Sequence, residues 1–107
     1  MGKRINFNDW DCELVKEEYQ AGGSPALALV AWQDDISQDI CKGEPIATCT
    51  VNLPDVPLRP DEVIIKDYSE NTGMLNTLLD AGVVEMTGKT IDTGFVTCPI
   101  CVLVSIE

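Results

Sequence analysis

Two cysteines, Cys98 and Cys101, form a CxxC pair that is the clearest candidate for chemistry in this sequence. Such a pair can supply half of a zinc site or, where the first thiolate lies at a helix N-terminus, a redox centre. Here the surrounding residues, FVTCPICVLV, are typical of a β-strand, and the other cysteines stand singly at positions 12, 41 and 49. We therefore expect free, buried thiols that behave as small core residues. Zinc binding and disulfide or redox chemistry at this pair stay open as alternatives.

Patterns typical of catalysis or cofactor binding are otherwise scarce. The chain contains no histidine, which removes the commonest general base and the commonest zinc ligand. The Gly22-Gly23 pair is followed by Ser-Pro and not by a lysine and a helix, so it is not a phosphate-binding loop. The sequence thus favours a protein without enzymatic activity, cofactor or metal. The alternative is a small accessory enzyme or metal-binding protein that uses Cys98 and Cys101.

A short helix is predicted where apolar residues recur at helical spacing. Gly82 suits the position just past the end of this helix, which favours a positive φ. At the other end, Ser69, Asn71 or Thr72 could cap the helix, and Glu70 would lie near the positive end of its dipole. The apolar stripe consists of Met74, Leu75, Leu78 and Leu79.

Several polar residues beside this helix are candidates for contact with a partner. Asp67 and Tyr68 are not needed for a helix cap, so a surface role is the natural interpretation. Other carboxylates lie close by in the sequence, around one predicted strand and turn, and could share a side of the protein with them. The candidate partner-binding residues are Asp61, Glu62, Asp67, Tyr68 and Glu70.

The first half of the chain has the pattern of antiparallel strands. Ile5 and Phe7 alternate with polar neighbours, and Asn8-Asp9 offers a turn. The alternation resumes at Trp10 with the opposite parity, as a chain reversal requires. Residues 46–53 alternate between apolar and polar side chains, which predicts a half-buried strand.

Turn-forming residues divide the C-terminal part of the chain. Thr87-Gly88-Lys89 and Asp92-Thr93-Gly94 predict two turns between short strands. No repeat or linker interrupts the sequence, so residues 1–107 are expected to form a single domain. The predicted fold class is α+β, mostly an antiparallel sheet in a hairpin meander with one short helix packed on one face. Further strands are predicted at residues 25–32, 62–66 and 101–106, and a polar loop at residues 33–45.

Acidic residues outnumber basic residues by 18 to 7, which gives a formal net charge of −11. The excess is spread over both halves of the chain, so it belongs to the folded surface and not to a tail. Such a surface repels phosphate backbones, which argues against direct binding of nucleic acid. It suits a protein partner with a basic surface, although charge that serves only solubility is the simpler alternative. The oligomeric state stays open.

Nothing in the sequence resembles a membrane or secretion signal. No apolar run approaches the roughly 20 residues that cross a bilayer. The N-terminal residues include two bases but lack the apolar run of a signal peptide. We therefore expect a cytoplasmic protein with reduced thiols and no membrane contact.

Four stretches of the chain together resemble a known family: DWDCELV, ATCTVNLP, EVIIKDYSENTGML and AGVVEMTGKTIDTGFVTCPIC. The family consists of uncharacterised small proteins of similar length that are carried by plasmids, conjugative elements and phages of gut and related bacteria. Its members often have alanine at the position of Cys98, which weakens the case for a metal site there. The resemblance implies an accessory protein of a mobile genetic element, and it assigns no catalytic residue. Together with the acidic charge, it allows an inhibitor of a host defence or nucleic-acid-binding protein.

Overall fold

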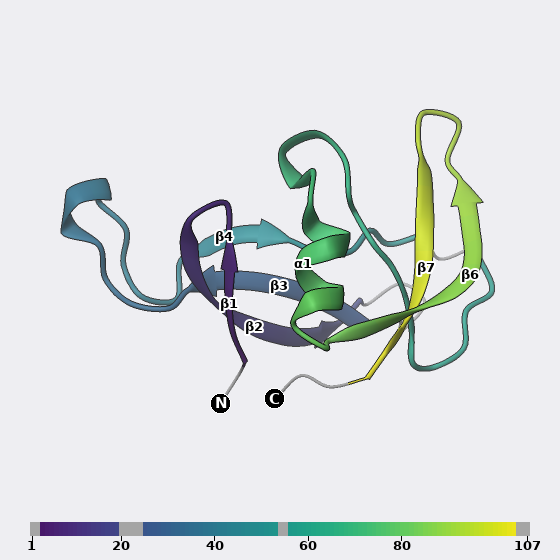
Figure 1. The fold of residues 1–107 in the computed structure, drawn as a ribbon, viewed down its shortest axis with the longest axis horizontal. Helices are drawn as coiled ribbons and strands as arrows, with labels where there is room; N and C mark the ends of the chain where they lie inside the picture. Colours follow the sequence, from purple (N-terminus) through teal and green to yellow (C-terminus); the bar gives the residue numbers. More distant parts are fainter. Residues whose placement is uncertain (1–2, 20–24, 54–55, 105–107) are drawn as a thin grey trace.

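The computed structural model describes residues 3–19, 25–53 and 56–104, which form two antiparallel sheets with one short α-helix between them (Figure 1). This arrangement confirms the predicted α+β class. The molecule is elongated, with extents of 42 × 27 × 26 Å. The first sheet consists, in spatial order, of β1 (Arg4–Phe7), β2 (Trp10–Glu18), β3 (Pro25–Ala31) and β4 (Pro45–Thr48). The second consists of β5 (Glu62–Ile64), β7 (Thr97–Leu103) and β6 (Val84–Asp92), and the helix is α1 (Met74–Asp80).

The first hairpin forms where the sequence predicts it. Asn8 and Asp9 both adopt positive φ angles, of 51° and 67°, so they make the two-residue turn that fits the twist of paired strands. Phe7 pairs with Trp10 across this turn, and Ile5 pairs with Cys12. The apolar residues of the two strands therefore share one face, which packs into the core.

The strand predicted at residues 46–53 is shorter than expected because the chain crosses from one sheet to the other. The strand β4 ends at Thr48, and the N–H of Cys49 still donates to a carbonyl of β3. Thr50 then bridges to Ile65 next to β5, in the second sheet. Thr50 is only 2% exposed, and Tyr19 lies 2.9 Å from its hydroxyl. Alternation in sequence could not reveal this crossing, because it does not show with which strand each residue pairs.

The turn predicted at Thr87-Gly88-Lys89 is wrong, because β6 runs through these residues as one strand with a bulge. Met86 pairs with Cys101 and Lys89 with the adjacent Ile100, so two residues of β6 have no opposite partner. The Thr87 hydroxyl donates to the carbonyl of Ile100 at 2.6 Å within the bulge. Glycine in a strand pattern signals either a turn or a bulge, and only the partner strand decides which. The other predicted turn, Asp92-Thr93-Gly94, does connect β6 to β7.

The helix α1 is confirmed, but its start differs from the predicted cap. Gly73 is the cap residue, and no side chain caps the helix directly. Residues Ser69–Asn71 form a separate 3₁₀ turn, η2, before it. At the other end Gly82 has the predicted positive φ, of 73°. Its N–H donates to Leu79, and the following N–H of Val83 donates to Leu78, the pattern of a glycine-terminated helix.

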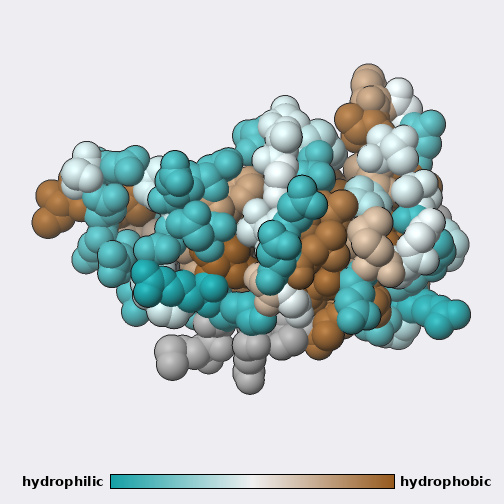
Figure 2. All heavy atoms as spheres, viewed as in Figure 1, coloured by the Kyte–Doolittle hydropathy of each residue, from teal (hydrophilic) through white to brown (hydrophobic). Residues whose placement is uncertain are grey.

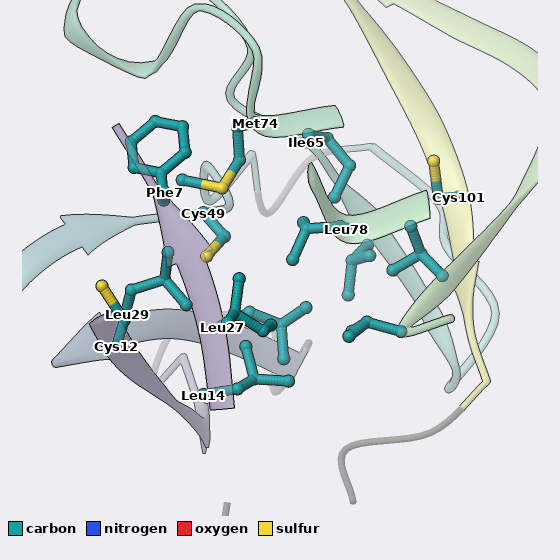
Figure 3. Close-up of a cluster of buried hydrophobic side chains, with 14 residues drawn as sticks. Phe7, Cys12, Leu14, Leu27, Leu29, Cys49, Ile65, Met74, Leu78 and Cys101 are labelled. Carbon is teal, nitrogen blue, oxygen red and sulfur yellow. The ribbon is translucent and has the colours of Figure 1, made fainter. Parts of the chain in front are cut away.

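The main core lies between the two sheets and beneath the helix (Figure 3). A smaller cluster covers the outer face of the second sheet and is centred on Ile64, Cys98 and Ile100. No helix in the described part of the chain is long and apolar enough to cross a membrane. The main core includes Phe7, Leu14, Leu27, Leu29, Ile65, Met74 and Leu78.

Candidate functional site

The CxxC pair does not form a joint site, because its two thiols lie on opposite faces of β7. Residues three apart in a strand point in opposite directions. Cys98 accordingly belongs to the outer cluster with Ile100, and Cys101 belongs to the main core (Figure 3). In this fold, one metal ion or one disulfide bond cannot engage both.

Burial also disfavours the thiolate form of most of the cysteines. Desolvation raises the pKa of Cys12 and Cys101 to about 11 and that of Cys49 to about 12, and it raises the pKa of Cys98 too. Since the thiolate is the nucleophile and the metal ligand, these side chains are poorly suited to either role. Cys41 is the exposed cysteine. Within the described ranges, no three cysteine or carboxylate side chains gather as a metal site would require.

Glu62, one of the five candidate contact residues, is committed to an internal ion pair. Its side chain is only 5% exposed and lies 2.6 Å from the Lys89 ammonium. The N–H of Arg59 donates to the same carboxylate at 2.8 Å. That hydrogen bond, together with Lys89, lowers the pKa of Glu62 below its ordinary value. Asp61 beside it is exposed, and both line a shallow hollow of about 360 Å³.

The other three candidates lie beyond the opposite end of β5 and also have internal partners. Asp67 is half-buried and accepts a hydrogen bond from the N–H of Gly73 at 2.7 Å. Glu70 is exposed and forms an ion pair with Lys66 at 2.6 Å, which lowers the pKa of Glu70. The same lysine lies 5.6 Å from the ring centre of Tyr68. The five candidates thus divide into two groups, and the structure does not bring them together as one surface.

A denser acidic surface lies at the far end of the first sheet. Asp9 and Asp11 stand in and beside the β1–β2 turn, and Asp34 and Asp35 follow β3. Successive antiparallel strands reverse direction, so the first and third connections of this sheet meet at the same end (Figure 1). Between them lies a hollow of about 410 Å³, which all four aspartates line. We call it the acidic groove.

Most of the charge in the acidic groove is uncompensated. Asp11 pairs with Arg4 at 2.7 Å, and that contact lowers the pKa of Asp11. In the described part of the chain, Asp9, Asp34 and Asp35 form no ion pair. The last two accept hydrogen bonds from uncharged backbone donors instead, which fix their carboxylates without neutralising them.

Apolar side chains lie among these aspartates. Trp10 and Ile40 line the groove and are half-buried. Ile36, in the 3₁₀ turn η1 (Ile36–Gln38), also lines it and is 95% exposed. Figure 2 shows hydrophobic atoms among hydrophilic ones at the left end of the molecule, where the loop after β3 lies. The groove therefore combines negative charge with apolar surface.

Sequence reasoning missed the acidic groove although its residues are conspicuous in the strings NDWD and QDDISQD. The two strings are more than twenty positions apart, so their proximity depends on strand order. A meander order, which the sequence did predict, places both connections at one end. Applying that order to the charged residues would have found the site.

Comparisons with protein-family models, curated proteins and solved structures found no match. The geometry and charge of the acidic groove are therefore the best guide to function.

Proposed function

We propose that this protein has no enzymatic activity and acts by binding a protein with a basic surface at the acidic groove. The observation that carries the proposal is the set of three aspartates, Asp9, Asp34 and Asp35, that surround one hollow without a cationic partner among the described residues. Carboxylates gathered in this way repel one another, and a lysine- or arginine-rich surface would relieve that repulsion.

The groove is organised before any partner arrives. Asp34 accepts a hydrogen bond from the N–H of Lys42 at 2.7 Å, and Asp35 accepts hydrogen bonds from the N–H and hydroxyl of Ser37. Two further backbone hydrogen bonds join Asp35 to Ile40. A preorganised surface loses less conformational entropy on binding, which favours recognition over mere solubility.

The resemblance to proteins of mobile genetic elements suggests what kind of partner this is. A host defence protein or another nucleic-acid-binding protein presents a basic surface, and an acidic protein can occupy it. We therefore propose an accessory protein that inhibits such a partner in the bacterial cytoplasm. The protein itself should not bind DNA or RNA, since its net charge of −11 opposes contact with phosphates.

The alternative of an accessory enzyme or metal-binding protein gains no support from the CxxC pair. Cys98 and Cys101 face opposite sides of β7 and cannot act on one substrate or ion together. We therefore retain partner binding as the proposal.

The test compares two variants that have the same change in net charge. In the first, Asp9, Asp34 and Asp35 all become Asn, which keeps the hydrogen-bond acceptors and suits the positive φ of position 9. In the second, three exposed acids elsewhere, Glu17, Glu18 and Glu85, all become Gln. Each variant and the wild type are immobilised and exposed to an extract of the native host, and bound proteins are identified by mass spectrometry.

The expected result is a basic protein that the wild type and the glutamine variant retain, that the asparagine variant loses, and that salt elutes. Equal retention by the two variants would show that overall charge, not the groove, is responsible, and would refute the proposal. Salt-sensitive binding of the wild type to duplex DNA in a mobility-shift assay would refute the exclusion of nucleic acid.

A further inference from the structure

We infer that the acidic groove recognises a short protein segment in which lysines and arginines flank a large apolar side chain. The inference rests on the proposed function and names the chemistry of the partner more narrowly. A partner that offered only positive charge would leave the apolar part of the groove unused.

The exposed isoleucine is the first reason. Ile36 is 95% exposed, and a large aliphatic side chain gains roughly 1.5–3 kcal/mol when it is removed from water. The neighbouring Ser37 and Gln38 show that polar residues are accommodated in the same turn.

The isoleucine is also held in place by the turn that carries it. Asp35 precedes it and caps the turn by accepting a hydrogen bond from Ser37. Asp35 and Ile40 exchange two backbone hydrogen bonds, of 2.8 Å and 3.0 Å, that close the loop behind Ile36. The side chain is therefore presented in a defined position, as interface anchors commonly are.

Charge complementarity identifies the occupant. Asp9, on the β1–β2 turn, and Asp11, at the start of β2, line the groove together with Asp34 and Asp35, on the loop after β3. Trp10 and Ile40 are half-buried in the lining, so they offer further apolar surface. A segment lying in this hollow can place an apolar side chain against Ile36 and Trp10 and direct cationic side chains to the aspartates. A nucleic acid fails the charge requirement, and a metal ion or polyamine would leave the apolar surface unmatched.

The test uses two synthetic peptides with the same lysine and arginine residues. One carries leucines between the basic residues, and the other carries serines in their place. Binding to the full-length protein is measured by calorimetry at low and at moderate salt. Two protein variants, Ile36→Ser and Phe95→Ser, provide the matched comparison, because Phe95 is 96% exposed on the distant β6–β7 connection. Both substitutions leave the charge unchanged and remove no buried side chain.

We expect the wild type to bind the leucine peptide about tenfold more tightly than the serine peptide, a difference of about 1.4 kcal/mol. The Ile36→Ser variant should lose this preference, and Phe95→Ser should keep it. Because screening weakens charge pairs and not apolar contacts, the preference should persist as salt rises.

The outcomes separate the inference from the proposed function. If both peptides bind the wild type equally, and the variant with Asn at positions 9, 34 and 35 loses both, the groove binds basic partners and the inference fails alone. If that variant binds both peptides as the wild type does, the groove is not the binding site and both fail. If the wild type binds neither peptide, the inference fails alone, and the experiment with the host extract decides the proposed function. An equal loss of preference in Ile36→Ser and Phe95→Ser would also overturn the inference.

Discussion

Asp67 supports the start of α1 without capping the helix directly. It lies six residues before Gly73, yet its carboxylate accepts the hydrogen bond of the Gly73 N–H at the start of α1. The residue that sequence reasoning assigned to a partner thus has a structural role. The three residues predicted to cap the helix instead belong to the preceding 3₁₀ turn or follow it.

We predict that Asp67→Ala lowers the free energy of unfolding by about 1 kcal/mol, the usual net contribution of one hydrogen bond, because the Gly73 N–H would lose its acceptor. Asp67→Asn should retain most of the stability, because the amide oxygen can accept the same hydrogen bond. Urea unfolding followed by circular dichroism measures both. Asp80→Ala, at the exposed C-terminal end of α1, is the control and should not destabilise, since an acid there opposes the helix dipole. Equal stability of Asp67→Ala and wild type would show that this hydrogen bond does not stabilise the start of α1.

The five cysteines differ in exposure, and this difference predicts their reactivity. We expect one thiol, Cys41, to react quickly with a thiol reagent at mildly alkaline pH. The others should react only on unfolding, since burial both blocks access and raises the pKa of Cys12, Cys49, Cys98 and Cys101. Cys41→Ser should abolish the fast phase. If two or more thiols of the folded protein reacted in the fast phase, the packing around β7 or β2 would be too loose to exclude the reagent.

The elements that could be predicted from the sequence are those specified by local chemistry. Asn8-Asp9 suffices for a tight hairpin, and Gly82 after an apolar stripe suffices for the end of a helix. The crossing at Thr50 could not be predicted, because it depends on two sheets that meet only in three dimensions. The acidic groove depends on strand order in the same way. Local sequence patterns therefore predicted most of the helices and strands, whereas the contacts between them could be seen only in the structure.

Gly88 lies in the bulge of β6, and its backbone conformation explains why glycine suits this position. Gly88 has a φ of +83°, and a Cβ built there would meet no atom within 4 Å. The cost of a side chain is therefore one of backbone strain and not of collision. We predict that Gly88→Ala lowers the free energy of unfolding by about 1 kcal/mol and that Gly88→Asn costs less, because Asn tolerates positive φ better.

Urea unfolding of the two Gly88 variants checks this. Thr90→Ala, at an exposed position of the same strand, supplies the control for a simple surface change. If Gly88→Ala were as stable as the control, position 88 would not need its positive φ, and the bulge would be free to relax.

At the scale of the whole molecule, acid should weaken the fold through its internal ion pairs. Glu62 has a pKa lowered from its ordinary value of 4.5 by the Arg59 N–H and by Lys89. A carboxylate whose pKa is lowered in the folded state stabilises that state at pH values above its ordinary pKa. This stabilisation is lost as the pH falls through the pKa of the folded state. We predict that Glu62→Gln is less stable than wild type at pH 7 and that this difference closes in acid.

Chemical unfolding at a series of pH values between neutrality and strong acid measures this convergence. The exposed Glu85→Gln serves as the control and should track the wild type throughout. A difference for Glu62→Gln that did not change with pH would show that the ion pair with Lys89 adds nothing to stability.

The net negative charge destabilises the folded protein, whereas the ion pairs stabilise it. Eighteen acids face seven bases, and three ion pairs are found in the described residues. Repulsion among the excess carboxylates therefore exceeds what three pairs can offset, since the pairs Arg4–Asp11 and Lys66–Glu70 are largely exposed and each contributes little. The same excess charge that we propose attracts a basic partner must then lower the stability of the free protein.

We therefore predict that salt stabilises the free protein while it weakens partner binding. Raising sodium chloride from about 0.1 M to about 1 M shortens the Debye length from about 10 Å to about 3 Å and screens the repulsion. The melting temperature should rise by about 5 °C, which corresponds to about 1 kcal/mol for a domain of this size. Calorimetry measures the melting temperatures of the wild type and of the variant with Asn at positions 9, 34 and 35. The variant lacks three of the repelling charges, so salt should raise its melting temperature less. A melting temperature that fell with salt would mean that the ion pairs outweigh the repulsion, and the acidic groove would then cost the fold nothing.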